Sequence, residues 1–393
     1  MEYSVKLSET FRRLSVPETG RQAIQLTEGK ATCYPLYYFI PSMTDDGCYL
    51  VYHRAGDGEV QLYCLDLTTG ESVQLTHASA PRTRWIPWCI ESGPGVLDHR
   101  SVLNTVRREV IYFDGNDVRC VDLETLADRR LFWLPEDRVA VGQNCVMPDG
   151  DWFVYIHHDR ENFAAVYSPE VRWGRHLSRG AVLAAYNLET GEHRTLVVIN
   201  SPIHHVLVYD EKHVVFCHPT RENGMLLTDL CGGWYSHLRT QDEMGGCVCH
   251  YNATTRGLAY EVLGRPDAVW SGLYDPYSHH HYEFQMPARF GYTHTGSDPE
   301  GMLWFYENEH RAEGVHDMHF LVRHDPEGED EWLALTGNWP TYGGGQKAHY
   351  HPRLTPDRQW ILITGGDPRT ESNHLFLVDA SDLKATEGIP DVV

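Results

Sequence analysis

Two histidines near the C-terminal end of the chain could bind a metal ion together. His349 and His351 lie in the segment QKAHYHP, residues 346–352, and in an extended strand side chains two apart share a face. Gln346 follows a triple glycine, which lets the backbone bend so that an amide oxygen turns inward as well. Two imidazoles and an amide form most of a ligand set for a divalent transition metal. The alternative is a pair of histidines at a strand start, one of them bonded to a carbonyl.

Length and charge limit the classes of function. The chain has 393 residues and a mass of 45.0 kDa, more than one hydrophobic core usually supports, so we expect several domains or a repeat architecture. The formal net charge of -22 argues against a nucleic-acid partner or an anionic membrane surface, because either would require basic patches. An acidic ligand would need a local island of Arg, Lys or metal.

The compartment is predicted from two features. The first residues, MEYSVK, do not combine a basic segment with an apolar one, and no apolar run approaches the length needed to span a bilayer. The ten cysteines are scattered without paired spacing, which is typical of small buried side chains in a reducing compartment. We therefore expect a cytoplasmic protein.

A polar turn followed by a short apolar strand recurs seven times along the chain. The repeats occur at intervals of about 40 to 60 residues, the range of propeller blades. Their apolar segments are residues 49–52, 110–113, 152–155, 214–216, 258–260, 302–305 and 360–363.

A second element, a hairpin turn rich in Asp, Asn and Gly, follows most of these strands. It is found at residues 65–71, 121–125 and 186–192, with weaker copies at 228–232 and 378–382. Short strands without helical periodicity indicate an all-β fold, and radial repetition protects the edges of such an array. We predict one seven-bladed β-propeller domain over residues 1–393, with repeats from about residue 20 to 385. Two stacked β-sandwich domains are the alternative.

Residues 160–179 depart from the strand pattern and predict a long loop insertion. The segment combines aromatic and cationic side chains, including Phe163, Arg172 and Trp173. Long loops in compact repeats are often functional, and a solvated loop is the alternative. Trp85, Trp88 and Trp173 could stack on sugar rings or pack in the core. The run His279–His281 is predicted to be a solvated strand and not a second metal site.

The pattern Gln-x-x-His-x-His-Pro-x-x-Thr-Pro-Asp, on the last blades of a propeller, resembles the oligogalacturonate lyases, cytoplasmic enzymes of pectin breakdown. The resemblance implies a manganese ion bound by Gln346, His349, His351 and a third histidine from the preceding blade. His294 matches that third histidine, because it precedes a strand-opening turn at residues 298–301.

The same resemblance implies catalytic residues. The family has a catalytic histidine before an apolar strand, and His250 in the segment CVCHY, residues 247–251, matches it. In the family, a catalytic arginine follows a short segment that matches residues 216–218 of this chain. The segment is shorter here, and Arg221 is the nearest candidate. An N-terminal histidine of the family is replaced by Cys33.

The chemistry of such a reaction suits these residue types. Breaking a 4-linked uronide by β-elimination requires removal of the weakly acidic proton at C5, next to a carboxylate. A divalent cation on that carboxylate stabilises the developing charge, and a neutral imidazole is a suitable base. Three histidines and a glutamine leave the +2 charge undiluted. An arginine beside the site would bind a second carboxylate.

We therefore expect a metal-dependent lyase for short acidic oligosaccharides such as digalacturonate, with Mn²⁺ or another divalent transition metal as cofactor. Two other classes stay open: a lyase for another uronide, such as rhamnosyl-glucuronate or ulvan-like oligomers, and a non-catalytic propeller of the translocation-protein (TolB) type. The sequence does not define the oligomeric state.

Overall fold

The computed structural model describes most of the chain. The exceptions are residues 1–4, 17, 83–92, 162, 164–179, 201–202, 218–223, 241–242, 244, 264, 266–268, 287–291, 300–302, 311–314, 324–330 and 384–393. Most of the predicted insertion, Arg221 and the three tryptophans named above therefore lie outside the described residues. Among the residues that are described, no helix has the length and apolar character needed to cross a membrane.

Within the described residues the strands form seven sheets, six of four strands and one of five. The first sheet contains β3 (Thr32–Tyr34), β4 (Tyr49–Gly56), β5 (Glu59–Asp66) and β6 (Ser72–Gln74). The second contains β7 (Val102–Asn104), β8 (Glu109–Asp114), β9 (Asp117–Asp122) and β10 (Asp128–Trp133). The third contains β11 (Arg138–Val146), β12 (Trp152–Asp159), β13 (Ala181–Asn187) and β14 (His193–Ile199). The fourth contains β15 (Val206–Val208), β16 (His213–Cys217), β17 (Met225–Asp229) and β18 (Ser236–Arg239).

The remaining three sheets complete the order along the chain. The fifth contains β19 (Cys247–Thr254), β20 (Gly257–Leu263), β21 (Trp270–Tyr274) and β22 (His281–Gln285). The sixth contains β23 (Tyr292–Ser297), β24 (Leu303–His310), β25 (Val315–Arg323) and β26 (Glu331–Asn338). The five-stranded sheet contains β27 (Arg353–Leu354), β28 (Trp360–Asp367), β29 (Ser372–Asp379), β2 (Gln22–Gln25) and β1 (Arg12–Ser15). The short 3₁₀ helix η1 (Gly345–Ala348) precedes β27.

The repeated sequence elements have fixed places in these sheets. The described residues of each apolar segment predicted from the repeats fall in the second strand of its sheet, for example in β4, β8 and β12. The turns at 65–71, 121–125 and 186–192 join the third and fourth strands. In these turns an Asp or Asn side chain accepts hydrogen bonds from the backbone amides two and three residues later, as Asp66 does from Thr68 and Thr69.

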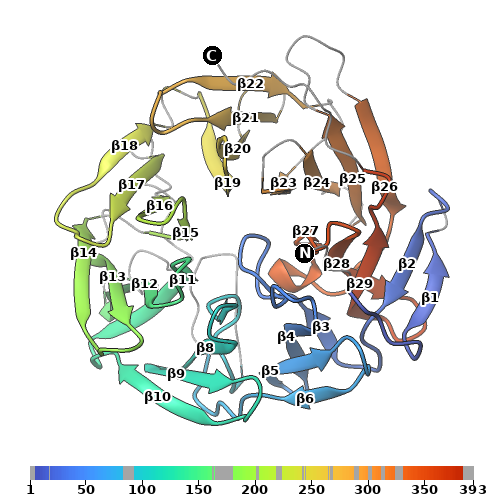
Figure 1. Ribbon diagram of the computed structural model, residues 1–393, viewed down its shortest axis with the longest axis horizontal. Coiled ribbons are helices and arrows are strands. Elements are labelled where there is room, and N and C mark those ends of the chain that lie inside the picture. The colour runs from blue at the N-terminus through green and yellow to red at the C-terminus, as the bar shows by residue number, and fades with distance from the viewer. Residues whose placement is uncertain are drawn as a thin grey trace.

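The sheets are arranged around a ring, with the first strand of each nearest the centre (Figure 1). Aromatic side chains fill the space between neighbouring sheets, as Phe113 of β8 does against Phe153 of β12, with ring centroids 6.2 Å apart. The all-β propeller predicted from the sequence is confirmed. The loop that joins β3 to β4 enters the centre of the ring, and it becomes part of the candidate site described below (Figure 1).

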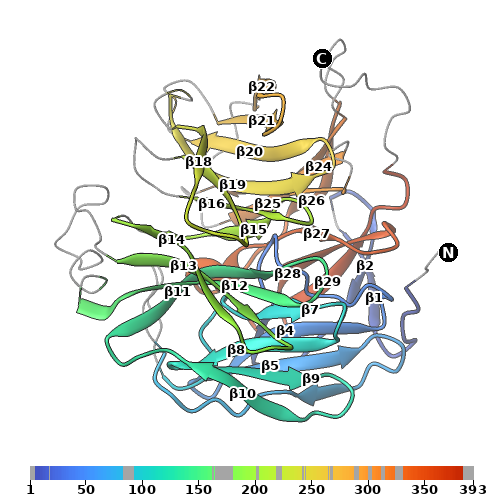
Figure 2. The same ribbon diagram turned by 60° about the vertical axis from the view of Figure 1, so that its left-hand side comes forward.

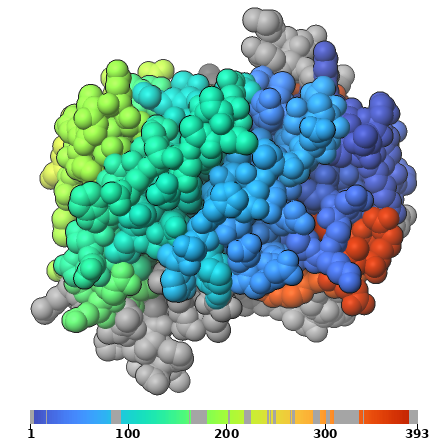
Figure 3. All heavy atoms as spheres, turned by 90° about the horizontal axis from the view of Figure 1, so that it is seen from below, coloured from blue at the N-terminus to red at the C-terminus, as the bar shows by residue number. Residues whose placement is uncertain are grey.

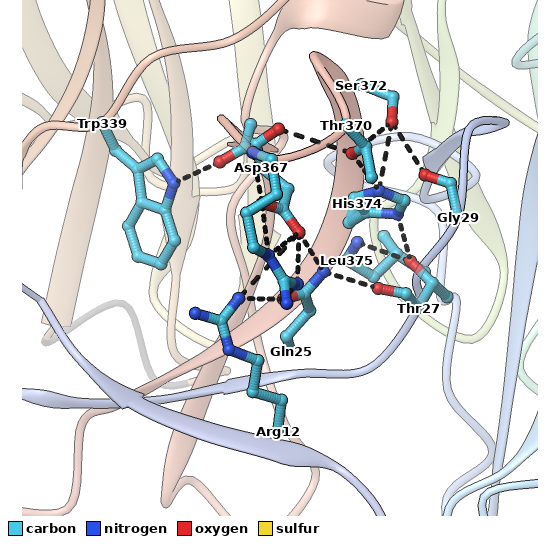
Figure 4. Close-up of polar contacts among 12 residues, drawn as sticks. Arg12, Gln25, Thr27, Gly29, Trp339, Asp367, Thr370, Ser372, His374 and Leu375 are labelled. Atoms are coloured by element: carbon cyan, nitrogen blue, oxygen red, sulfur yellow. Dashed lines mark hydrogen bonds and ion pairs between the residues drawn. The ribbon is translucent and has the colours of Figure 1, made fainter.

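The ring is closed by strands from both ends of the chain. β2 pairs antiparallel with β29, so the N-terminal and C-terminal strands share one sheet and lie side by side (Figures 2 and 3). Asp367 strengthens this junction, because Gln25 donates a hydrogen bond of 3.1 Å to it (Figure 4). Hydrogen bonds from Arg369 lower the pKa of Asp367 well below its usual range. The closed ring fixes the inner strands, which carry the candidate site.

Candidate functional site

Most of the histidines singled out in the sequence meet at the centre of the ring. His250 lies on β19 and His294 on β23, both first strands of their sheets, and their ring centroids are 4.3 Å apart. His294 also lies 4.7 Å from the rings of both His349 and His351. Gln346 completes the group through a hydrogen bond to His351. The structure therefore brings together all four predicted metal ligands and the predicted base, and all five side chains are buried.

The backbone geometry behind this grouping differs from the predicted strand. Gln346 lies in η1, and His349 is the residue that ends this helix. His351 has a φ of 47°, a left-handed conformation that is strained for a residue with a Cβ atom. The prediction that strand alternation aligns His349 with His351 was wrong. A helical turn followed by a kink brings them together, with ring centroids 5.9 Å apart.

The glycines before this turn have the role predicted for them. Gly343 and Gly345 have φ values of 78° and 70°, which residues with a side chain rarely adopt. These two positions turn the chain so that the buried Gln346 side chain faces the histidines and not the solvent.

Glu307 of β24 holds two of the candidate ligands in place. His294 Nδ1 donates to Glu307 Oε2 over 2.9 Å, and His349 Nδ1 donates to Oε1 over 2.8 Å. The backbone amide of His351 also reaches Oε2, at 3.3 Å. A carboxylate that accepts from Nδ1 leaves Nε2 as the metal-binding atom of an imidazole and fixes the orientation of the ring. His294, Glu307 and His349 also place potential ligand atoms within 4.8 Å of one another.

The ring nitrogens of His351 have different surroundings from those of His294 and His349. Its Nε2 lies 2.8 Å from Gln346 Oε1, whereas its Nδ1 is buried and has no hydrogen-bond partner among the described residues. A buried ring nitrogen of this kind is costly unless it binds something. Gln346 thus either orients His351 or joins it as a ligand through the same amide oxygen.

Burial keeps the imidazoles of His294 and His351 neutral. Burial first, and then the neighbouring His250, lower the pKa of His294 to about 3. Burial, followed by the proximity of His294 and His99, lowers the pKa of His351 well below its usual value. A neutral imidazole retains the lone pair that a metal ion needs. The donor set of imidazoles and an amide oxygen, with a carboxylate that orients two of the rings, fits a divalent transition ion such as Mn²⁺ or Zn²⁺.

His250 is oriented by a second buried carboxylate. Its Nδ1 donates to Glu261 Oε1 on the adjacent strand β20, and both side chains are at most 1 % exposed. Burial and then the charge of Glu307 raise the pKa of Glu261 well above its usual value. The fifth and sixth sheets therefore repeat one arrangement, in which a first-strand histidine bonds to a second-strand glutamate.

Two tyrosines from the loop between β3 and β4 pack on the histidines from the centre of the ring. The Tyr38 ring lies 5.2 Å from that of His294 and 5.5 Å from that of His250. Tyr37 lies 4.8 Å from His351. The Tyr38 hydroxyl accepts a 3.1 Å hydrogen bond from the backbone amide of Tyr251. These aromatic rings pack the imidazoles into fixed positions.

A separate cavity of about 520 Å³ opens at the carboxyl ends of the inner strands. Asn144, Asn252, Ser297 and Arg353 contribute to its walls, whereas the candidate ligands do not. Tyr38 lines this cavity and also packs against His250 and His294. It therefore contacts both the cavity and the candidate site.

Sequence reasoning missed both glutamates. Each lies within a second strand whose neighbouring side chains are buried: Glu307 follows Trp304, Phe305 and Tyr306, and Glu261 follows Tyr260. A single carboxylate inside an apolar strand was the signal, since charged residues are rarely buried without a partner.

Other sequence predictions have different outcomes. The side chains of His279–His281 are exposed, as predicted, but only His281 lies in a strand, so the strand predicted for His279 and His280 was wrong. Cys33 is buried in a hydrophobic cluster with residues such as Ile24 and Leu50, where burial raises the pKa of its thiol to about 11. Arg221 lies outside the described residues, so its predicted catalytic role stays a prediction.

Fold and site together define a class: an all-β propeller with a buried histidine-rich centre suited to a divalent metal ion. Within that class, the family model described as oligogalacturonate lyase matches residues 1–230. The chain belongs to the oligogalacturonate lyase family. This match ends before His250, so the family assignment and the geometry of the site are independent observations.

Individual relatives agree with the assignment. The chain is 26 % identical over 220 residues to an oligogalacturonate lyase of Dickeya dadantii (strain 3937), and 25 % identical over 222 residues to an oligogalacturonide lyase of Pectobacterium atrosepticum. These alignments cover 54 % of the chain and 52 % of each relative, so the chain spans about half the length of the curated relatives it matches. A solved oligogalacturonate lyase in complex with manganese has the same fold, with a TM-score of 0.77, 23 % identity and coverage of 98 % of this chain and 99 % of that one.

Proposed function

We propose that the protein is a metal-dependent lyase that cleaves short 4-linked uronides such as digalacturonate by β-elimination. The observation that carries the proposal is the contact between His250 and His294, with rings 4.3 Å apart. This contact supports the proposal that a base acts directly beside the metal ligands. A base and a cation must act on the same uronate, the base at C5 and the cation at the adjoining carboxylate.

His250 is proposed to take the C5 proton. Its Nδ1–H is engaged by Glu261, which fixes the tautomer so that Nε2 is the atom that accepts a proton. As the C5–H bond breaks, its electron pair forms the C4–C5 double bond, the C4–O bond breaks, and the departing oxygen takes up a proton. Glu261 stabilises the imidazolium that forms on His250.

His294, His349, His351 and Gln346 are proposed to hold the metal ion, with Glu307 orienting two of the rings. A bound divalent ion supplies positive charge that stabilises the negative charge developing on the substrate carboxylate. Manganese is proposed because the solved relative with this fold is in complex with manganese and because the ligand types here suit it.

Other parts of the sequence reading belong to the same proposal. We propose one propeller domain over residues 1–393 with seven blades, supported by the seven sheets of the described residues and by the pairing of β2 with β29. A cytoplasmic location stays a prediction from the sequence, and it agrees with a preference for short imported oligomers.

Product formation tests the proposal. The wild-type protein with Mn²⁺ should convert digalacturonate to an unsaturated product that absorbs in the near ultraviolet, with little action on intact polygalacturonate. His250→Ala should keep its fold and metal content but lose turnover on the order of 10²-fold, because the general base is gone.

Rhamnosyl-glucuronate in the same assay distinguishes the alternatives. Product from this substrate and none from digalacturonate would retain the chemistry and replace the substrate. A protein that cleaves no uronide while binding Mn²⁺ would be the non-catalytic propeller. Loss of metal in His250→Ala would make this residue a ligand and contradict its role as base.

A further inference from the structure

A second buried polar group, the Asp98 cluster (Tyr34, Arg82, Asp98 and Lys347), lies beside the candidate metal centre. Asp98 accepts a 2.8 Å hydrogen bond from the Tyr34 hydroxyl at one oxygen and a 3.0 Å hydrogen bond from Arg82 Nη1 at the other. Asp98 and Arg82 are each about 5 % exposed at the side chain. One carboxylate is thus largely satisfied by a hydroxyl and a guanidinium.

Lys347 is the accessible member of this cluster. Its Nζ lies 3.6 Å from Asp98 Oδ2, an ion pair that is longer than a hydrogen bond, and its side chain is 33 % exposed. The ammonium also lies 5.8 Å from the centroid of the Tyr34 ring. An ammonium has three N–H donors. Asp98 and Tyr34 therefore hold Lys347 in place while its donors stay available to a ligand.

The cluster is connected to the candidate metal centre in two ways. Lys347 lies in η1, between the candidate ligands Gln346 and His349. Through space, the Tyr34 ring lies 5.2 Å from His99, whose ring lies 5.2 Å from that of His351. His99, like His351, has a positive φ, of 57°. Strained non-glycine residues gather where a site fixes its side chains closely.

The charge of the cluster favours an anion. Two cations, Arg82 and Lys347, face one carboxylate, which leaves a net charge of +1 in a chain whose formal net charge is -22. An acidic oligosaccharide approaching this chain is repelled overall and needs such an island. Since a uronide dimer carries a carboxylate on each sugar, a metal ion can neutralise only the one it binds.

We propose that Lys347 binds the second carboxylate of the substrate, on the uronate next to the one held at the candidate metal centre. Asp98 acts as a positioning residue, because it fixes the ammonium over Tyr34. The inference rests on the proposed function for its substrate class, and it names the residue that makes the site specific for two adjacent acidic sugars. A neutral sugar in the second position lacks the group that Lys347 binds.

Binding to an inactive protein tests this inference separately from turnover. Saturated digalacturonate is titrated by calorimetry into Mn²⁺-loaded His250→Ala, and into the same variant carrying Lys347→Met, Lys347→Arg or Lys212→Met. Lys212 is an exposed lysine in the turn between β15 and β16 and serves as the matched control. Lys347→Met should weaken binding by about 10-fold or more, as expected for loss of a charge-assisted hydrogen bond. Lys347→Arg should recover most of the affinity, and Lys212→Met should change it little.

Metal content and salt dependence complete the test. Manganese content should be equal in all variants, and binding should depend less on ionic strength after Lys347→Met. Unchanged affinity in Lys347→Met, absence of digalacturonate binding in the His250→Ala parent, or loss of metal on changing Lys347 would each overturn the inference. If digalacturonate binds through Lys347 while the wild-type protein forms no unsaturated product, the inference stands and the lyase proposal fails.

Discussion

Glu307 and Asp98 are both buried carboxylates connected to His351, but different kinds of partner compensate their negative charges. Glu307 accepts hydrogen bonds from the imidazoles of His294 and His349. Asp98 is paired with Arg82 and, at longer range, with Lys347. Burial by itself raises the pKa of Asp98, but Lys347 and the other nearby cationic groups lower it below its usual value.

The difference indicates what each region is built to bind. A buried carboxylate beside a guanidinium needs no further cation. Near Glu307, burial first lowers the pKa of His294, and burial first, followed by the charge of Glu307, raises the pKa of Glu261. Glu307 accepts its hydrogen bonds from the imidazoles of His294 and His349, so a divalent cation would balance its negative charge. The Glu307 region is thus suited to a cation, and the Asp98 region to an anion.

The largest expected effect is on the metal itself. The double variant His349→Ala/His351→Ala removes two of the candidate ligands, so the purified protein should lose bound Mn²⁺ and, with it, turnover. Elemental analysis after dialysis gives the metal content. The double variant His279→Ala/His281→Ala, which changes an exposed histidine between β21 and β22 and an exposed histidine at the first residue of β22, is the control and should keep its metal. Metal content that the first variant leaves unchanged would contradict the ligand assignment.

The two buried carboxylates provide a direct comparison. Glu307→Gln keeps the shape of the side chain but weakens its hold on His294 and His349, so Mn²⁺ affinity should fall by about 10- to 100-fold. Asp98→Asn should leave Mn²⁺ affinity near the wild-type value, because its partners are Tyr34 and two cations. Competition with a fluorescent chelator measures both affinities. Equal losses in the two variants would show that the two regions are not distinct.

The sequence predicted the fold through its local repeats. The second strand of each sheet and the hairpin turns depend on nearby residues, such as Asp66 and the amides that follow it, so the pattern is visible along the chain. The closure of the ring by β2 and β29 depends on residues more than 350 positions apart, such as Ala23 and Val378, and local patterns carry no signal for it.

The sequence predicted the candidate metal ligands better than it predicted the residues that orient them. The spacing of Gln346, His349 and His351 is local, and the structure brings these side chains together with His294 and His250. The cross-strand partner Glu307 and the Asp98 cluster are assembled from different sheets and loops. The left-handed conformation of His351 arises from its tertiary surroundings, so the strand predicted around it was wrong.

The smallest expected effect is a pH dependence of the protein's stability that arises from His53, next to the Asp98 cluster. His53 stacks on Tyr34, with ring centroids 4.9 Å apart, and its Nδ1 donates to the backbone carbonyl of Pro35. Burial lowers the pKa of His53 to about 4. The charge of Asp98 acts in the opposite direction, whereas Lys347 and Arg82 lower this pKa further. In the unfolded chain the ordinary value is about 6.5.

The sign of the effect follows from these two values. Above a pH of about 6.5 His53 is neutral in both states, and its contribution to stability is fully present. As the pH falls from about 6.5 towards 4, the unfolded chain takes up a proton that the folded protein does not, so that contribution is lost. The melting temperature should therefore fall between pH 7.5 and pH 5, and His53→Asn, which has no titrating group, should show a smaller fall. His237→Asn, at an exposed position on β18, should keep the wild-type dependence. Equal pH dependence in wild type and His53→Asn would show that the neutral, stacked imidazole does not set the stability of this region.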